Sequence, residues 1–134
     1  MKTPQCKLSI TLPAGPEAVF DALTNSKKIL AWSGGQRGIV EPKVGGKFEF
    51  FDGWVKGKVL AYERGKRLSY TWLTADWPEG TQASVVSYVL TKAGARTKIS
   101  LTHAWFPNAK EMKSHKSGWT EYVFNPLKHY FSKL

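Results

Sequence analysis

The chain has 134 residues, a formal net charge of +10 and a single cysteine, Cys6. A chain of this length fits one domain, which buries an adequate core without disulfide or metal staples. The lone cysteine excludes an internal disulfide framework, and neither a leader-like segment nor a membrane-length apolar run is visible, so we expect one cytoplasmic domain over residues 1–134.

The N-terminal part predicts one strand followed by two short helices. Apolar and polar residues alternate over residues 6–12, which is the pattern of a half-buried strand. Pro16 and Glu17 suit the first turn of a helix, because that turn tolerates a missing N–H and favours a negative charge. Asn25 with the following serine is suited to cap a second short helix over residues 27–32.

The central part predicts six further strands. Asp52 and Gly53 form a dipeptide typical of hairpin turns. The strand signals lie at residues 38–41, 47–51, 54–62, 68–72, 85–91 and 96–104. Together with the first strand they predict an antiparallel sheet of about seven strands, whose apolar face needs a cover.

The last segment, from about residue 109 to 134, has a helical period. Its apolar residues recur at steps of three and four: Met112, Trp119, Val123, Leu127, Tyr130 and Leu134. An amphipathic helix of this length spans about 37 Å. Gly118 and Pro126 weaken it, and Pro126 should kink it, so we expect the helix to be held by packing on the sheet.

Short motifs spread over roughly residues 8–130 carry a family resemblance. They are Pro13-Ala14, Pro16-Glu17 with Val19-Phe20-Asp21-Ala22-Leu23-Thr24, Trp32, Gly45-Gly46-Lys47-Phe48, Gly57-Lys58-Val59, Leu68-Ser69-Tyr70-Thr71-Trp72, Thr97-Lys98-Ile99-Ser100-Leu101-Thr102-His103 and Gly118-Trp119. In this order they resemble the branch of the START-like (SRPBCC) superfamily named for the activator of the heat-shock protein 90 ATPase homologue. The resemblance implies an α+β helix-grip (START-like, Bet v-type) fold with an internal apolar cavity. Function is less constrained, since the superfamily hosts carriers, cyclases, hydrolases and co-chaperones.

Strand parity separates an inner apolar face from an outer basic face. With residues from the helices added, the predicted cavity set is Trp32, Phe48, Phe50, Tyr70, Trp72, Tyr88, His103, Trp119, Tyr122 and Val123. Parity places Glu49 and Phe51 on the outer side. The same rings would equally fill a solid core, so the inner set is consistent with a ligand pocket or with ordinary packing.

The histidines are the remaining candidates for chemistry. His103 on the inner face is suited to bind a ligand or act as a general base, or is a core histidine satisfied by a neighbouring hydroxyl. No inner carboxylate is predicted to orient it. Glu111 and His115, four residues apart on the helix, are interpreted as an exposed polar pair. The spacing of the three histidines fits no metal site, and no cofactor motif is present.

The outer face offers an alternative site. The predicted basic surface is Lys47, Lys56, Lys58, Arg67 and Lys98, joined by Lys110, Lys113 and Lys116 near the start of the last helix. With Trp54 and Tyr62 interleaved, this surface suits an acidic protein partner, although scattered lysines are also ordinary solvated residues. Nucleic acid is not the partner that we expect.

Three functions follow as hypotheses. The first is non-enzymatic binding of a small, mostly apolar ligand by a monomer or homodimer. The alternative is a co-chaperone-like module that binds an acidic partner, such as heat-shock protein 90, through the basic surface. The third is an enzyme that uses His103 in the cavity.

Overall fold

The computed structural model describes residues 4–133, and over these residues seven antiparallel strands form one curved sheet. Its strand order is β1-β7-β6-β5-β4-β3-β2. The strands are β1 Cys6–Leu12, β2 Ile39–Val40, β3 Lys47–Phe50, β4 Val55–Glu63, β5 Arg67–Thr74, β6 Ser84–Ala93 and β7 Arg96–Ala104. The sheet predicted from the alternation is therefore confirmed.

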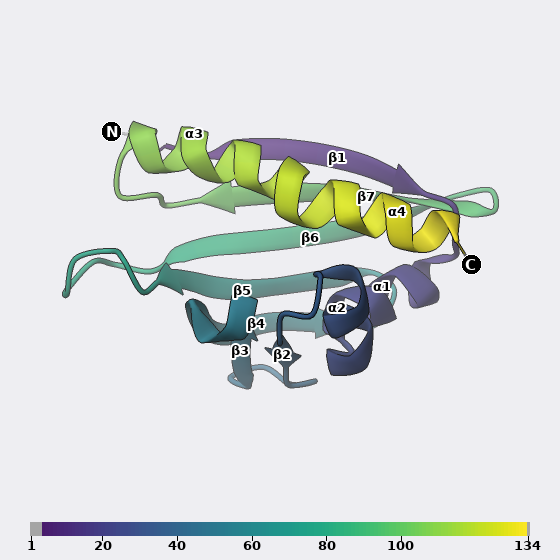
Figure 1. Cartoon of the computed structure of the whole chain (residues 1–134), viewed down its shortest axis with the longest axis horizontal. Coiled ribbons are helices and arrows are strands. Elements are labelled where there is room, and N and C mark those ends of the chain that lie inside the picture. The colour runs from purple at the N-terminus through teal and green to yellow at the C-terminus, as the bar shows by residue number, and fades with distance from the viewer. Residues whose placement is uncertain (1–3, 134) are drawn as a thin grey trace.

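Two short helices and one long helical segment complete the fold. Helices α1 (Pro16–Thr24) and α2 (Ser26–Trp32) follow β1, and the long segment comprises α3 (Ala109–Gly118), a π-helical turn (Trp119–Phe124) and α4 (Asn125–Ser132). Figure 1 shows α3 through α4 running as one rod across a face of the sheet, with α1 and α2 near the α4 end. This is the predicted arrangement of a sheet gripping its last helix.

The backbone around Pro126 shows how the last helix tolerates a proline. Pro126 lacks the N–H that a regular helix requires. Ahead of it the chain widens into the π-helical turn, in which the Asn125 N–H donates to the Thr120 carbonyl five residues back. The disturbance predicted at Pro126 is thus a π-helical turn, and the helix continues beyond it as α4. Leu134, the last member of the predicted apolar series, lies outside the described residues.

A glycine allows β4 and β5 to approach closely. A Cβ atom on Gly57 would lie 1.8 Å from the Thr71 carbonyl oxygen, so no larger residue fits there without a backbone shift. Shortly beyond, the register between β4 and β5 shifts between Val59 and Ala61. Such irregularities bend a strand, and here they help the sheet to curve.

The core lies between the inner face of the sheet and the helices. Buried strand residues alternate as parity predicts, with Tyr70 and Tyr88 fully buried between sheet and helix. Trp32 fixes α2 against α1 by donating from Nε1 to the Ala22 carbonyl at 2.7 Å. Among residues 4–133, no helix has the length and apolar character needed to cross a membrane.

Candidate functional site

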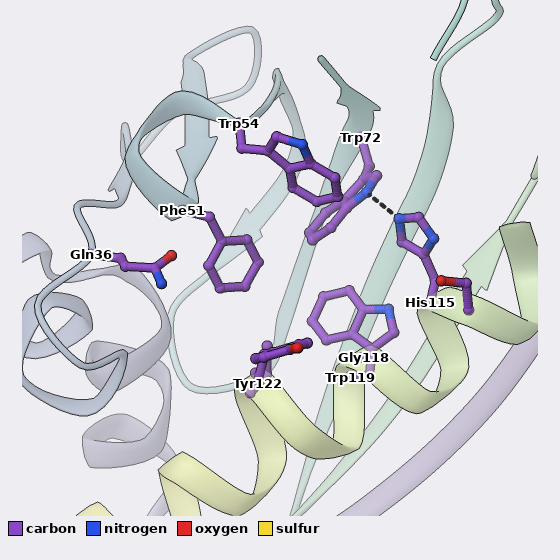
Figure 2. Close-up of a pocket in the computed structure, with 10 residues that line it drawn as sticks. Gln36, Phe51, Trp54, Trp72, His115, Gly118, Trp119 and Tyr122 are labelled. Carbon is purple, nitrogen blue, oxygen red and sulfur yellow. Dashed lines mark hydrogen bonds between the residues drawn. The ribbon is translucent and has the colours of Figure 1, made fainter. Parts of the chain in front are cut away.

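An open pocket of about 370 Å³ lies between the β3–β4 turn and the last helix (Figure 2). The turn comprises a short 3₁₀ segment, Phe51–Gly53, followed by Trp54. The residues that line the pocket are Gln36, Phe51, Trp54, Trp72, Ser114, His115, Gly118, Trp119, Tyr122 and Val123. The helix and the turn therefore supply opposite walls, and strand β5 supplies Trp72.

Aromatic rings form most of the pocket wall. In Figure 2 the rings of Phe51 and Trp54 lie across a common space from those of Trp119 and Tyr122. The centroids of the Trp72 and Trp119 rings are 5.0 Å apart. Flat apolar surfaces of this kind favour an apolar or aromatic ligand.

Phe51 reaches the pocket through an unusual backbone conformation. Its φ is 53° and that of Asp52 is 58°, both in the left-handed region that non-glycine residues seldom adopt. Asp52 holds the turn by accepting a hydrogen bond from the Arg37 N–H at 2.7 Å. Because β3 ends at Phe50, strand parity no longer applies at Phe51, and the prediction that Phe51 faces outward is wrong.

His115 is the polar centre of the pocket. The Trp72 Nε1–H donates to His115 Nε2 at 3.2 Å, and His115 Nδ1 lies 3.0 Å from the Glu111 carbonyl oxygen. The first bond makes Nε2 an acceptor, so Nδ1 carries the proton and donates to that carbonyl. Burial lowers the pKa of His115 and so favours the neutral ring. The Glu111 backbone and carboxylate oppose this shift only in part.

Glu111 supports His115 from behind the pocket. Its Oε1 accepts a hydrogen bond from Trp77 Nε1 at 2.8 Å and lies 3.8 Å from His115 Nδ1. The side chains of His115 and Glu111 are 9% and 25% exposed, so the prediction of an exposed polar pair is wrong. Asn108 caps the helix by accepting from the Glu111 N–H, which fixes the start of α3.

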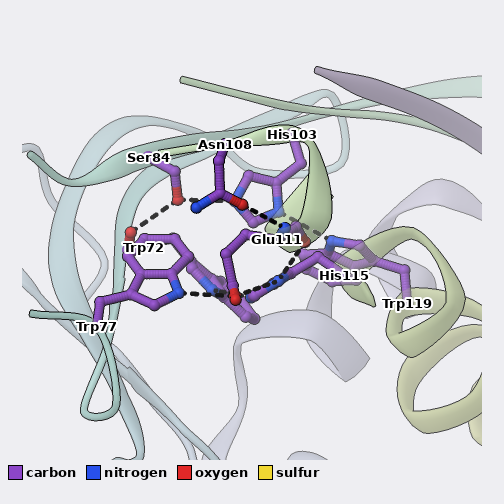
Figure 3. A network of polar contacts seen from close by, with 8 residues as sticks. All are labelled: Trp72, Trp77, Ser84, His103, Asn108, Glu111, His115 and Trp119. Carbon is purple, nitrogen blue, oxygen red and sulfur yellow. Dashed lines mark hydrogen bonds and ion pairs between the residues drawn. The ribbon is translucent and has the colours of Figure 1, made fainter. Parts of the chain in front are cut away.

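His103 is fully buried and belongs to a hydrogen-bond network behind the pocket wall (Figure 3). The Trp119 Nε1–H donates to His103 Nδ1 at 3.0 Å, so Nε2 carries the proton and donates to Ser84 Oγ at 2.8 Å. Ser84 in turn donates to the Trp72 carbonyl at 2.8 Å. Burial, aided by repulsion from His115, lowers the pKa of His103 to about 2. His103 is thus a neutral core histidine, one of the two interpretations of the sequence, and neither ring nitrogen is free for a substrate.

The predicted cavity residues divide into two groups. Four of them line the pocket: Trp72, Trp119, Tyr122 and Val123. The other six are buried in the packed core beside it: Trp32, Phe48, Phe50, Tyr70, Tyr88 and His103. Phe48 and Tyr70, for example, stack with centroids 3.6 Å apart, which leaves no room for a ligand between them.

Three aromatic residues lie elsewhere than predicted. Tyr122 is 59% exposed and stands at the rim of the pocket rather than in its interior. Trp54, predicted on the outer basic surface, lines the pocket instead. Its ring is nearly parallel to that of His115, at an interplanar angle of 18° and a centroid distance of 6.4 Å. Tyr62 packs edge-on against Phe20 beside the core.

Sequence reasoning missed six of the ten lining residues, which are Gln36, Phe51, Trp54, Ser114, His115 and Gly118. One signal for His115 was available, because His115, Trp119 and Val123 are four residues apart and share one face of a helix. No periodic signal exists for Gln36 or Trp54, since both lie in connecting segments.

The predicted basic residues are exposed but do not form one surface. Lys47, Lys56, Lys58, Arg67 and Lys98 lie on the outer face of the sheet, whereas Lys110, Lys113 and Lys116 lie on α3, which covers the inner face. On the outer face, Lys47 Nζ is paired with Glu49 Oε2 at 2.8 Å. This contact raises the pKa of Lys47 and lowers that of Glu49.

The fold agrees with comparisons to known proteins. The family model described as activator of Hsp90 ATPase homolog 1-like protein matches residues 13–132. The chain belongs to this family. Its membership confirms the resemblance seen in the motifs and the START-like, helix-grip fold that the resemblance implies.

Individual relatives cover nearly all of this chain. The activators of 90 kDa heat shock protein ATPase homolog 1 from mouse and human are each 27% identical to it over 133 residues, which are 98% of this chain and 38% of theirs. The chain thus spans about two fifths of the length of these curated relatives.

Two solved structures match along almost their full length. An Hsp90 activator from Plasmodium falciparum has a TM-score of 0.86 and 25% identity, with 96% of each chain covered. A protein from Mesorhizobium loti has a TM-score of 0.82 and 26% identity, covering 97% of this chain and 98% of its own.

Proposed function

We propose that this protein binds a small, mostly apolar ligand in the pocket between the β3–β4 turn and the last helix, without transforming it. The observation that carries the proposal is the ring-lined cavity of about 370 Å³. Binding sites for small molecules typically measure about 300–1,000 Å³ and combine apolar walls with a few polar groups. His103 supports no enzymatic alternative, because both its ring nitrogens are already hydrogen-bonded within the core.

The test is a titration with N-phenyl-1-naphthylamine, an uncharged apolar dye whose fluorescence rises in apolar surroundings. We expect saturable binding by the wild type and a clear loss of affinity in Trp54→Ala, because Trp54 is a partly exposed wall of the pocket. Trp105→Ala is the matched control, since Trp105 is also an exposed tryptophan but does not line the pocket. Equal loss in both variants, or no saturable binding, contradicts the proposal.

A second candidate function is association with an Hsp90-type chaperone. It is favoured by the similarity to an Hsp90 activator of Plasmodium falciparum, which covers 96% of both chains. The outer basic face is the surface suited to an acidic partner, because the lysines and the arginine there are exposed.

This candidate is tested by capturing purified Hsp90 on the immobilised protein at low and high salt. Contacts between exposed charges are screened by salt, so we expect retention at low salt that falls steeply as salt is added. The double variant Lys56→Glu/Lys58→Glu should lose retention, whereas Lys110→Glu/Lys113→Glu carries the same charge change on α3 and should keep it. Absence of retention at low salt excludes this candidate.

A further inference from the structure

The walls of the pocket carry no formal charge. None of the ten described residues that line it is an aspartate, glutamate, lysine or arginine. Burying a charged group against aromatic rings without a counter-ion is unfavourable. The pocket therefore selects an uncharged ligand, although the protein as a whole carries a formal net charge of +10.

The shape of the walls favours a flat ligand. Five of the lining side chains are aromatic: Phe51, Trp54, Trp72, Trp119 and Tyr122. Rings from the turn and rings from the helix lie on opposite sides of the space (Figure 2). Aromatic surfaces pair most favourably with other aromatic surfaces in offset-stacked or edge-to-face contact.

One donor and one acceptor lie side by side in the wall. Trp72 Nε1 and His115 Nε2 are 3.2 Å apart, and both residues line the pocket. The acceptor character of Nε2 is fixed by the other side of the ring, where Nδ1–H donates to the Glu111 carbonyl. Figure 3 shows Glu111 held in turn by Trp77, so the support extends to the loop between β5 and β6.

A hydroxyl group is the chemical complement of this pair. Its oxygen accepts from the Trp72 Nε1–H while its proton is donated to His115 Nε2, so both atoms keep a partner when their own hydrogen bond opens. An ether or ketone oxygen only accepts, so inserting it here would leave His115 Nε2 without a donor. Such a ligand would instead leave the bond between Trp72 and His115 closed and gain no hydrogen bond from it.

We propose that the preferred ligand is an uncharged, flat aromatic molecule with a hydroxyl group that inserts between Trp72 Nε1 and His115 Nε2. This inference rests on the proposed ligand-binding function and adds the chemical class of the ligand. In this arrangement His115 positions and recognises the ligand, and the ligand keeps its hydroxyl proton.

The experiment compares four probes that share one ring system: 2-naphthol, 2-methoxynaphthalene, naphthalene and 2-naphthoate. Dissociation constants are measured at neutral pH by quenching of tryptophan fluorescence. We expect 2-naphthol to bind about tenfold more tightly than its methyl ether, because only the hydroxyl satisfies both wall atoms. The charged 2-naphthoate should bind weakest.

Two variants locate the preference. His115→Phe keeps an aromatic wall but removes the acceptor, so the advantage of 2-naphthol over its methyl ether should fall to within about twofold. His129→Phe makes the same change on an exposed position of α4, outside the pocket, and should keep the full preference. A wild-type NMR titration adds a readout that needs no variant, since 2-naphthol should shift the indole N–H signal of Trp72 more than naphthalene does.

The outcomes separate this inference from the function on which it rests. If all four probes bind equally, or if the naphthoate binds best, the hydroxyl proposal is wrong while the binding function stands. If none of the four probes binds, both are wrong. If the preference survives in His115→Phe, the recognition does not occur at this pair.

Discussion

His103 shows how a titratable residue is kept in the core of this protein. The ring is fully buried, and each nitrogen has one partner, Trp119 on the helix and Ser84 on the sheet. A buried polar group is tolerated when its hydrogen bonds are satisfied. The ring thus joins the last helix to strand β6, at the cost of remaining uncharged.

This arrangement predicts a dependence of stability on pH. The folded pKa of His103 is lowered to about 2 from an ordinary value of 6.5, so the unfolded state binds more protons between these values. The free energy of unfolding should therefore be intact above about pH 6.5 and fall below it, by about 2 kcal/mol at about pH 5.

Urea unfolding at about pH 7.5 and about pH 5 measures the difference. His103→Gln has no titrating ring and should lose most of this slope, while the lowered pKa of His115 leaves a smaller slope of the same sign. An unchanged slope in His103→Gln would show that His103 is not the group responsible.

The hydroxyls of Tyr70 and Tyr88 form a second buried polar pair. They hydrogen-bond to each other across β5 and β6, and burial raises the pKa of both phenols. Tyr70→Phe should cost about 1–3 kcal/mol, because it leaves the Tyr88 hydroxyl buried without a partner. The double variant with Tyr88→Phe should be more stable than the sum of the single changes by at least about 1 kcal/mol. A double-mutant cycle in urea tests this, and additive losses would contradict the pairing.

Single residues also show where sequence reasoning succeeds and fails. Alternation assigned Phe48, Tyr70 and Tyr88 correctly to the inner face, because successive residues of a strand point to opposite sides. It could not tell a packed ring from a ring at a pocket, since both are apolar and inward. The four-residue spacing of Glu111 and His115 suggests an exposed polar pair, but the same helical geometry places His115 beside Trp119.

At the scale of elements, the long helix combines a stable fold with a pocket wall. Gly118 ends α3 and lines the pocket, where a Cβ atom would meet only Tyr122 Cδ2, at an ordinary 3.8 Å. Gly118→Ala should therefore stabilise the protein by up to about 1 kcal/mol through helix propensity. The added methyl group occupies pocket space, so affinity for the naphthylamine dye should fall.

The two effects are measured by thermal unfolding and by dye titration. Ser117→Ala is the control, because it raises helix propensity at an exposed neighbouring position that does not line the pocket. Ser117→Ala should stabilise the helix without lowering the affinity for the dye. If Gly118→Ala is more stable but binds the dye with unchanged affinity, the dye binds outside this pocket.

The contact between β4 and β5 predicts a severe effect of a small change. Gly57→Ala forces a Cβ atom against the Thr71 carbonyl oxygen, and should cost at least about 3 kcal/mol or prevent folding. Gly15→Ala, at a position with open space around it, should cost less than about 1 kcal/mol. Urea unfolding of the two variants makes the comparison, and similar stabilities would mean that the strands separate easily.

Elements were predictable to the extent that their periods are regular. The strands and both short helices were found within a few residues, because alternation and capping signals are local. The π-helical turn at Trp119–Phe124 was not predicted, because a regular helical period gives no sign of the extra residue that such a turn contains. Phe51 and Trp54 were misplaced for a related reason, because the turn that carries them interrupts the strand pattern.

At the scale of the whole molecule, the pocket exists only when the β3–β4 turn and the last helix are both in place. A ligand that binds there stabilises the folded state alone. At a free concentration of about 100 times its dissociation constant, such a ligand adds about 2.7 kcal/mol to the free energy of unfolding. The naphthylamine dye should therefore raise the melting temperature of the wild type, and raise it less in Trp54→Ala. An equal rise in both proteins would indicate binding outside the pocket.

Strand order also governs when the protein can finish folding. β1 precedes the other six strands of this sheet in the chain, yet it pairs with β7, in a register that joins Leu12 to Thr97 and Cys6 to His103. Each strand from β2 to β7 pairs with the strand next to it in the sequence. These strands can therefore form successive hairpins while the chain is still being synthesised. β1 must wait until about 90 further residues have left the ribosome. Until then the hydrogen-bonding edge of β1 remains available to chaperones or to aggregation, and the apolar face of the sheet stays uncovered still longer, because the last helix follows β7 in the chain.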